Sequence, residues 1–372
     1  MTSFDARPSP RILFGPGRLS ELPDAVKSLG GTNILLVTDT GIVAAGHIRH
    51  ATGLLRDAGL QVTTYQDTHV NPAESDIEAC RAFAADVAPD LIIGFGGGSS
   101  MDTAKGCNFL LNNGGRMSDY HGYGHAEKPL LPFIAVPTTA GTGSECQSFA
   151  VVSRDGSHEK IACGDPKALA KIALLDPELT LSQPQKVATL TALDALSHAL
   201  ETAVCTKRNP ISQAYSRQAF RLISSSIEAV ITNTARINNR ADMLLGAAMA
   251  GSAIENSMLG AAHALANPLT AFFDVPHGHA VALTLPHVIR FNAEDPESAA
   301  TYDDFSRYLG EPLIDWLESI IASAKLPHLN IDPTRIPELT AAALPQWTGK
   351  FNPRPITKSD ITALYQAALT VA

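Results

Sequence analysis

The feature that most constrains the fold is a regular alternation, through the first half of the chain, of short apolar runs with stretches of helical periodicity. The apolar runs are NILLVTD (33–39), QVTTYQ (61–66), DLIIGFGGG (90–98) and LPFIAVPTT (131–139). Helical periodicity covers 41–57, 74–86 and 100–112 between them. Apolar strands separated by helices indicate a parallel sheet that is covered on both faces. The first half is therefore predicted to be an α/β domain.

The pattern changes near the middle of the chain. Before this change, three more strand-like segments follow the first four: FAVVSR (149–154), EKIACG (159–164) and KIALLDP (171–177). The composition then changes near 177–184 to an Ala- and Leu-rich sequence with capped helical segments, which indicates an all-helical domain. A chain of 372 residues is also too long for one small core. We predict an α/β domain over 1–182 and a helical domain over 183–372.

Composition and charge limit the classes of partner. The net charge is −9 and Lys and Arg form no long cluster, which argues against a nucleic-acid partner. The sequence contains no run of about 18 apolar residues, so we expect no membrane span. The segment MTSFDARPSP does not resemble a secretory signal. The five cysteines include no CxxC pair, so we expect them to be reduced and buried. The expected location is the cytoplasm.

Two loops after apolar runs have the composition of phosphate-binding loops. GFGGGSSMDTAKG (94–106) follows a strand and leads into a helix, so its glycines would let backbone N–H groups approach a pyrophosphate. Ser99 and Ser100 are expected to cap that helix. PTTAGTGSE (137–145) supplies hydroxyl groups after the next strand. Paired at the carboxyl ends of adjacent strands, the two loops would line the crevice where open α/β sheets bind ligands, although each alone is also compatible with a plain turn.

Asp39 ends the run NILLVTD. Its carboxylate could accept hydrogen bonds from a ribose and repel a 2′-phosphate, which would favour NAD over NADP. The alternative is that Asp39 is only the N-cap of the next helix, a position where Asp is common.

Four residues in the helical half have side chains suited to a divalent transition metal. Asp194 and His198 are spaced i and i+4, which places both on one helix face. His263 lies on a second helical stretch, and His277 follows Pro276 in a predicted turn. Three imidazoles and one carboxylate suit iron(II) or zinc with a position left for a substrate oxygen, whereas magnesium would require more oxygen ligands.

Together these segments resemble the iron-dependent (group III) alcohol dehydrogenase family, in order and over nearly the whole chain. The resemblance rests on GGGSSMDTAKG, PTTAGTGSE, the helix with Asp194 and His198, His263, and PHGHAVALTLPHVIRFN. It implies an N-terminal dinucleotide-binding domain followed by a helical domain, a dehydroquinate synthase-like architecture. The implied metal ligands are Asp194, His198, His263 and His277. The implied cofactor contacts are Asp39, Asn71, Gly97, Gly98, Ser99, Asp102, Thr138, Thr139, Thr142, Ser144 and Lys160.

Two positions depart from the family pattern. Many members have a further histidine four residues after the third ligand, to which proton relay is assigned, whereas this chain has Asn267. Asn does not titrate near neutral pH but can orient a water molecule or bind a polar substrate. Many members have a small or apolar residue where this chain has His279, for which we expect a structural role.

The resemblance implies a metal-dependent alcohol dehydrogenase or aldehyde reductase that transfers a hydride between a small primary alcohol or aldehyde and NAD(H). Fe²⁺ is the expected metal, with Zn²⁺ as the alternative, and a homodimer or larger homo-oligomer is the expected assembly. A 2-hydroxy acid–oxo acid transhydrogenase with the same sites is an alternative reaction. A non-catalytic nucleotide-binding protein is the alternative of a different class. Phe149, Leu259 and Phe272 are candidates for the substrate pocket, with core packing as their alternative role.

Overall fold

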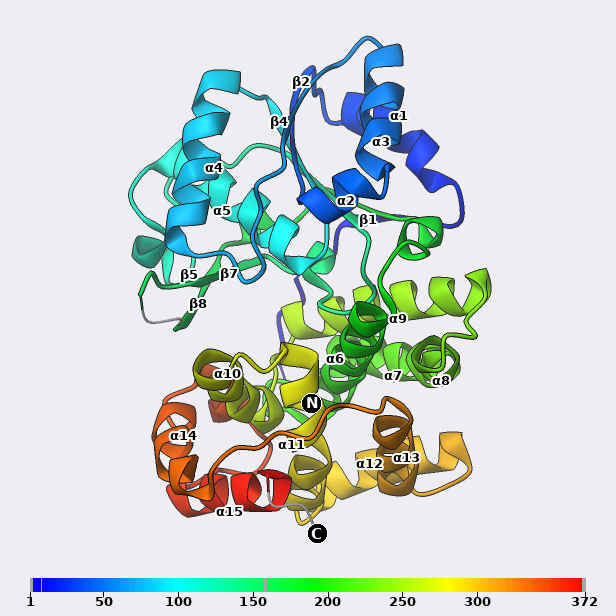
Figure 1. The fold of residues 1–372 in the computed structure, drawn as a ribbon, viewed down its shortest axis with the longest axis vertical. Helices are drawn as coiled ribbons and strands as arrows, with labels where there is room; N and C mark the ends of the chain where they lie inside the picture. The colour runs from blue at the N-terminus through cyan, green and yellow to red at the C-terminus, as the bar shows by residue number, and fades with distance from the viewer. Residues whose placement is uncertain (1–2, 8, 157–158, 370–372) are drawn as a thin grey trace. The chain divides into compact units, whose positions relative to one another are not determined.

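The chain divides into two compact units. The structure is a computed structural model that describes residues 3–7, 9–156 and 159–369. One unit is Pro8–Gln183; the other runs from Pro184 and also takes in the N-terminal residues up to Arg7. Compared with the boundary predicted after residue 182, the helical unit begins at Pro184 and includes an N-terminal segment that the sequence pattern did not assign to it. Figure 1 shows the helices and strands of each unit.

The α/β unit contains a six-stranded sheet in the order β1-β9-β6-β4-β2-β3, in which all neighbours are parallel. The strands are β1 (Arg11–Phe14), β2 (Asn33–Val37), β3 (Gln61–Tyr65), β4 (Leu91–Gly96), β6 (Phe133–Pro137) and β9 (Ile172–Leu175). Every residue of β4 and β6 is buried, as expected for central strands covered on both sides. The predicted parallel sheet is confirmed.

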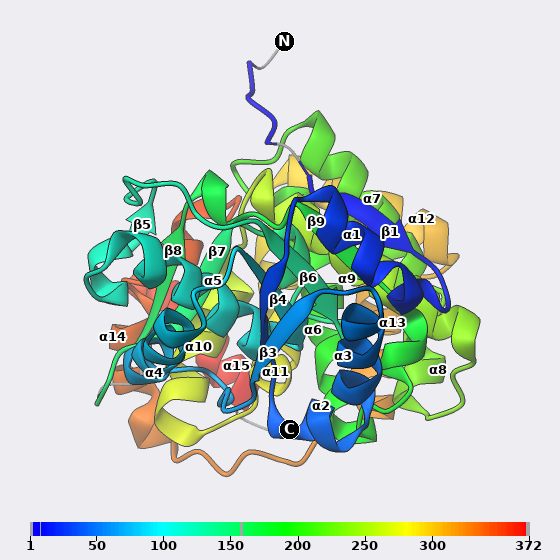
Figure 2. The same ribbon diagram turned by 90° about the horizontal axis from the view of Figure 1, so that it is seen from above.

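Helices cover both faces of this sheet (Figure 2). On one face, α1 (Leu22–Ser28) and α3 (His47–Asp57) pack on Leu36 and Ile93. On the other face, α4 (Glu74–Val87) and α5 (Gly98–Asn113) pack on Leu35 and Ile92. Adjacent residues of one strand therefore belong to different clusters, because successive strand side chains point to opposite faces. Both faces need apolar residues, which explains why the strands are almost continuously apolar.

The prediction of one continuous helix over 41–57 is wrong, because the structure has two helices there. The segment is divided into α2 (Thr40–Ala44) and α3 by Gly46, which has a φ of 85°. That left-handed conformation interrupts the helical backbone and is readily adopted only by glycine.

The other predicted strands belong to two different sheets. The segment 171–177 supplies β9 of the main sheet, whereas β7 (Phe149–Ser153) and β8 (Lys160–Gly164) form an antiparallel pair in a separate sheet with β5 (Gly122–Tyr123). Phe149 lies on β7, where its ring packs 5.6 Å from that of Tyr123. This contact is consistent with the packing role that was the alternative for Phe149.

The helical unit is built around α6 (Gln185–Val204), whose residues from Ala192 to Val204 are all buried. The other helices are α7 (Pro210–Ser224), α8 (Ile227–Ile231), α9 (Ile237–Glu255), α10 (Ala261–Phe273), α11 (His277–Asn292), α12 (Pro296–Leu309), α13 (Leu313–Ser323), α14 (Ile336–Ala343) and α15 (Lys358–Leu369). Among the residues that the structure describes, no helix is both long and apolar enough to cross a membrane. The predicted all-helical second domain is confirmed.

Two close contacts join distant segments of this unit. At the start of α11, Gly278 lies so close to α6 that a Cβ atom would be 2.1 Å from the carbonyl oxygen of Leu190. The N-terminal segment is attached at the end of α9: Arg7 N donates to Asn256 Oδ1 at 2.7 Å, and Arg7 Nη1 lies 3.2 Å from Glu255 Oε1.

Candidate active site

Three helices bring the predicted metal ligands together. Asp194 and His198 lie one turn apart on α6, His263 lies in the first turn of α10, and His277 is the first residue of α11. The Nε2 atom of His198 lies 3.5 Å from Asp194 Oδ1. The Nε2 atoms of His263 and His277 each lie 3.6 Å from the same oxygen. Residues separated by up to 83 positions in the chain thus present ring nitrogens to one carboxylate oxygen.

The donor atoms of this cluster fit a divalent metal. The ligand atoms of Asp194, His263 and His277 lie within 4.8 Å of one another. Asp194 Oδ1 and His263 Nε2 are buried and make no hydrogen bond to any described residue. Buried polar atoms without partners are costly, and a transition metal would satisfy both atoms at once. The geometry therefore suits the ion that the sequence predicted.

The charges within the cluster support one another. Burial alone would raise the pKa of the Asp194 carboxyl, but the three surrounding imidazoles outweigh it and hold that pKa well below its usual range. Burial disfavours protonation of His263, but the carboxylates of Glu201 and Asp194 outweigh it and raise the His263 pKa to about 9. Asp194 is therefore an anion that is held in place to attract a cation.

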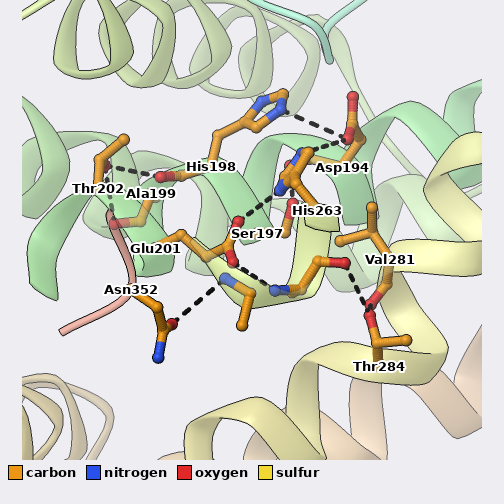
Figure 3. A network of polar contacts seen from close by, with 12 residues as sticks. Asp194, Ser197, His198, Ala199, Glu201, Thr202, His263, Val281, Thr284 and Asn352 are labelled. Carbon is orange, nitrogen blue, oxygen red and sulfur yellow. Dashed lines mark hydrogen bonds and ion pairs between the residues drawn. The ribbon is translucent and has the colours of Figure 1, made fainter. Parts of the chain in front are cut away.

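Glu201 is a residue of this site that sequence reasoning did not identify. It lies on α6 two turns after Asp194 and is 4% exposed. Its Oε2 atom accepts a hydrogen bond from His263 Nδ1, on the side of the ring away from Asp194 (Figure 3). The signal in the sequence was the spacing of Asp194, His198 and Glu201, which places all three on the same side of one helix.

The loops after three adjacent strands of the α/β unit also meet. β6, β4 and β2 are neighbours in the sheet, so Thr138, Gly97 and Asp39 follow strands that end at the same edge. A Cβ atom on Gly98 would lie 2.8 Å from Thr142 Cγ2, so the two predicted phosphate-binding loops are in close contact. This adjacency is the arrangement predicted for the ligand crevice of an open α/β sheet.

Comparisons with known proteins decide the family. Residues 9–177 match the family described as iron-containing alcohol dehydrogenase, and residues 188–369 match the C-terminal part of the Fe-containing alcohol dehydrogenase family. The chain belongs to the iron-containing alcohol dehydrogenase family. The family predicted by resemblance is thereby confirmed.

Individual relatives agree with this assignment. Alcohol dehydrogenase 4 of Schizosaccharomyces pombe is 32% identical over 367 residues, covering 96% of this chain and 87% of that protein. The structure of alcohol dehydrogenase from Oenococcus oeni has a TM-score of 0.92 at 30% identity, covering 98% of this chain and 100% of that chain. Sulfoacetaldehyde reductase from Bifidobacterium kashiwanohense, solved in complex with NAD⁺, has a TM-score of 0.91 at 25% identity and covers 100% of both chains.

As a member of this family, the chain is an NAD-dependent oxidoreductase that interconverts an alcohol and its aldehyde and uses iron. This reaction class and these cofactors are the ones predicted from the sequence.

The glycine-rich loop differs in one respect from its prediction. The expected capping of α5 by Ser99 and Ser100 is wrong: the N-cap is Gly97, and no side chain caps the helix. Ser99 Oγ accepts from Asn71 N at 3.2 Å, and Ser100 Oγ donates to Asp39 Oδ2 at 3.2 Å. The serines connect this loop to its neighbours, and the N–H groups of the first turn of α5 receive no side-chain cap.

Asp39 is the N-cap of α2, which is the role that was predicted as the alternative to ribose binding. Its Oδ1 atom accepts from Ile42 N at 3.0 Å at the start of α2. Its Oδ2 atom accepts from Ser100, and each carboxylate oxygen has further lone pairs, so capping and ribose binding are compatible.

Asp102 and Ser144 belong to a buried polar cluster. Ser144 Oγ donates to Asp102 Oδ1 at 3.1 Å and accepts from Lys105 Nζ at 2.9 Å. Burial raises the pKa of Asp102 to about 6, although Lys105 and Ser144 oppose the shift. Lys160 lies at the start of β8 and its charge also lowers the pKa of Asp102. Lys105, which is 1% exposed, is a second residue that sequence reasoning missed.

The remaining predicted cofactor residues lie in the same loops. Thr138 is buried and its Oγ1 atom makes no hydrogen bond to a described residue. Thr139 is half-buried and lies next to Gly97. Thr142 Oγ1 accepts from Ser144 N at 3.3 Å. Thr138 thus has a polar atom available for a ligand.

Glu145 gives a stability prediction that is independent of the metal. Burial raises its pKa to about 7, so the folded protein holds this proton more tightly than the unfolded chain. The stabilisation that this proton contributes is fully present below the pKa of Glu145 in the unfolded chain. It is lost as the pH rises through the pKa of Glu145 in the folded protein. Relative to Glu145→Gln, we expect the wild type to lose about 2 kcal/mol of unfolding free energy between about pH 5.5 and pH 8.

Urea unfolding of both proteins at the two pH values measures this difference. Any cost of the buried amide is the same at both pH values and cancels. Parallel pH dependences for wild type and Glu145→Gln would contradict the prediction.

The residues that depart from the family pattern are also placed. Asn267 lies on α10 one turn after His263, and its Nδ2 atom donates to Gln346 Oε1 at 3.0 Å. His279 is 2% exposed in the first turn of α11, and burial lowers its pKa. Burial favours the structural role expected for His279.

Two candidates for the substrate pocket differ in exposure. Leu259 is half-buried just before α10, whereas Phe272 is 42% exposed, so the alternative that Phe272 packs in the core is wrong.

Proposed function

We propose that this chain is an alcohol dehydrogenase whose iron(II) is held by Asp194, His198, His263 and His277, and that its substrates are small primary alcohols and their aldehydes. The observation that carries the proposal is the convergence of three Nε2 atoms on Asp194 Oδ1 at 3.5–3.6 Å. A bound divalent ion there would supply Lewis-acid polarisation of the substrate oxygen.

The chain's own residues bind the ion and keep it in place. Asp194 contributes the negative charge, and its burial at 5% exposure keeps that charge from being screened by water. The rings of His198 and His263 are stacked, with centroids 4.9 Å apart and planes 21° apart, which restricts their rotation. Ordered ligands lose little side-chain entropy when the ion binds.

The α/β unit is proposed to bind NAD(H) along the loops after β2, β4 and β6. The N–H groups at the start of α5, which no side chain caps, suit the pyrophosphate. The carboxylate of Asp39 suits ribose hydroxyls and disfavours a 2′-phosphate. The proposed contacts are those given by the resemblance: Asp39, Asn71, Gly97, Gly98, Ser99, Asp102, Thr138, Thr139, Thr142, Ser144 and Lys160.

Phe149 and Leu259 are proposed to border the substrate, which would restrict it to small molecules. We further propose that the enzyme is cytoplasmic and that it assembles as a homodimer or larger homo-oligomer.

The test of the proposed function is metal removal and replacement. The purified chain is stripped with a chelator, and NADH oxidation with a series of small aldehydes is measured before stripping, after stripping and after addition of Fe²⁺ or Zn²⁺. We expect turnover to disappear and to return best with Fe²⁺. Turnover that needs a second oxo acid instead of free NAD(H) would indicate the transhydrogenase, and nucleotide binding without metal-dependent turnover would indicate a non-catalytic protein.

Asn267 is proposed to contact substrate or an ordered water molecule and to carry no proton. Asn267→His would place a group with a pKa near 6.5 one turn beyond His263. We expect the pH profile of kcat/KM to gain a step in that range, whereas Asn267→Ala, which also loses the bond to Gln346, should keep the wild-type shape. An Asn267→His profile that matches the Asn267→Ala profile would show that a histidine here relays no proton.

A further inference from the structure

We propose that Glu201 is a positioning residue of the metal site: it holds His263 as the tautomer protonated on Nδ1, so that the lone pair of Nε2 faces Asp194. The inference rests on the proposed ligand set, to which it adds the group that prepares one ligand.

Glu201 uses both of its oxygens on α10. Oε1 accepts from Ala262 N at 2.7 Å, and Oε2 accepts from His263 Nδ1. Both donors belong to consecutive residues of the first helical turn, and Glu201 and His263 are 4% exposed. With water excluded, the carboxylate is the only acceptor that the structure gives to His263 Nδ1 among the described residues.

The tautomer follows from this contact. To bind a metal through Nε2, His263 must be neutral and carry a single proton, and because a carboxylate can only accept, Glu201 holds that proton on Nδ1. Nε2 then has a lone pair, and that atom lies 3.6 Å from Asp194 Oδ1. Histidine ligands of metals are generally fixed in this way by a carboxylate or carbonyl on the other ring nitrogen, and loss of such a partner weakens metal binding about 10–100-fold.

Glu201 also stabilises the start of α10, so a purely structural role must be separated from the positioning role. The N-cap residue Gly260 has no side chain, and the first N–H groups are satisfied from elsewhere. Ala262 N donates to Glu201, and Ala261 N donates to Asn352 Oδ1 at 3.3 Å (Figure 3). Asn352 therefore offers a matched control, because it caps the same turn without touching His263.

Glu201→Gln separates the two roles. An amide has one acceptor oxygen, whereas Ala262 N–H and His263 Nδ1–H both require one. If the amide oxygen faces Ala262, its NH₂ group faces His263 and favours the tautomer with the proton on Nε2, which cannot bind a metal. If it faces His263, the NH₂ group opposes Ala262 N–H in a buried site, which is unfavourable.

The experiment compares wild type, Glu201→Gln and Asn352→Ala. Zn²⁺ dissociation constants are measured by chelator competition, ligand-field absorption is recorded with Co²⁺, and the melting temperature is measured without metal. We expect Glu201→Gln to weaken Zn²⁺ binding about 10–100-fold and to change the Co²⁺ spectrum. Asn352→Ala should lower the metal-free melting temperature but keep Zn²⁺ affinity within about threefold and the Co²⁺ spectrum of the wild type.

Each outcome distinguishes the hypotheses. Wild-type affinity and a wild-type spectrum in Glu201→Gln would overturn the positioning role, as would equal losses of affinity in Glu201→Gln and Asn352→Ala. A wild-type protein that binds neither Zn²⁺ nor Co²⁺ would instead contradict the proposed function.

Discussion

Replacing Asp194 by Asn is expected to remove the metal and to lower kcat/KM by on the order of 10³-fold or more, which corresponds to about 4 kcal/mol. The substitution keeps the size of the side chain but removes the carboxylate near which all three imidazoles place their Nε2 atoms. The surrounding histidines lower the pKa of Asp194, and the attraction is mutual, so its negative charge is coupled to their charge. A neutral amide would leave the ion with three neutral ligands in a buried site.

The measurement combines metal content after dialysis with NADH-linked turnover. Ser197→Ala is the control, because Ser197 is buried on the same helix and its hydroxyl donates to the backbone carbonyl of Asp194 at 2.6 Å, not to its carboxylate. We expect this variant to retain metal and most of its activity. One equivalent of metal and activity within tenfold of wild type in Asp194→Asn would show that the carboxylate is not a required ligand.

Gly278→Ala is expected to destabilise the helical unit by about 3 kcal/mol and to impair the metal site together with the fold. The added Cβ would lie 2.1 Å from Leu190 O, a backbone atom that cannot rotate away. The start of α11 must therefore shift away from α6. Since His277 precedes Gly278 and Asp194 lies on α6, the shift also separates two proposed ligands, and displacements of about 1 Å at such sites cost on the order of 10²-fold in rate.

Urea unfolding without metal measures the stability term, and chelator competition measures the effect on metal binding. Gly53→Ala is the matched control: Gly53 lies within α3, and a Cβ added there would meet no atom within 4 Å. Alanine should stabilise that helix by up to about 1 kcal/mol. Unchanged stability of Gly278→Ala would mean that α6 and α11 can separate without cost.

The sheet and the site were predictable to different degrees. The central strands are apolar on both faces because helices cover both, and this leaves a clear signal in the sequence. The i and i+4 spacing also placed Asp194 and His198 on one face before any tertiary information. His263 and His277 were added from their residue types and the family resemblance then implied the same set, because the spacing along the chain does not show which helices become neighbours.

What the sequence did not reveal depends on tertiary contacts. Glu201 reads as an ordinary helix residue until α10 presents two N–H donors to it. Ser99 and Ser100 looked like caps, but bonds to Asn71 and Asp39 from neighbouring loops determine their orientation. Gly46 lies within a stretch of helical periodicity, and periodicity does not report a change to a left-handed backbone.

The attachment of Arg7 beside Glu255 has a consequence for folding during synthesis. The two residues are 248 positions apart, so at about 5–20 residues per second the partner leaves the ribosome roughly 10–50 s after Arg7. The α/β unit is continuous from Pro8 to Gln183 and is translated in the interval. In topological terms it is an insertion into the helical unit. The contacts of Arg7 must therefore close late, after the inserted unit has had time to fold on its own.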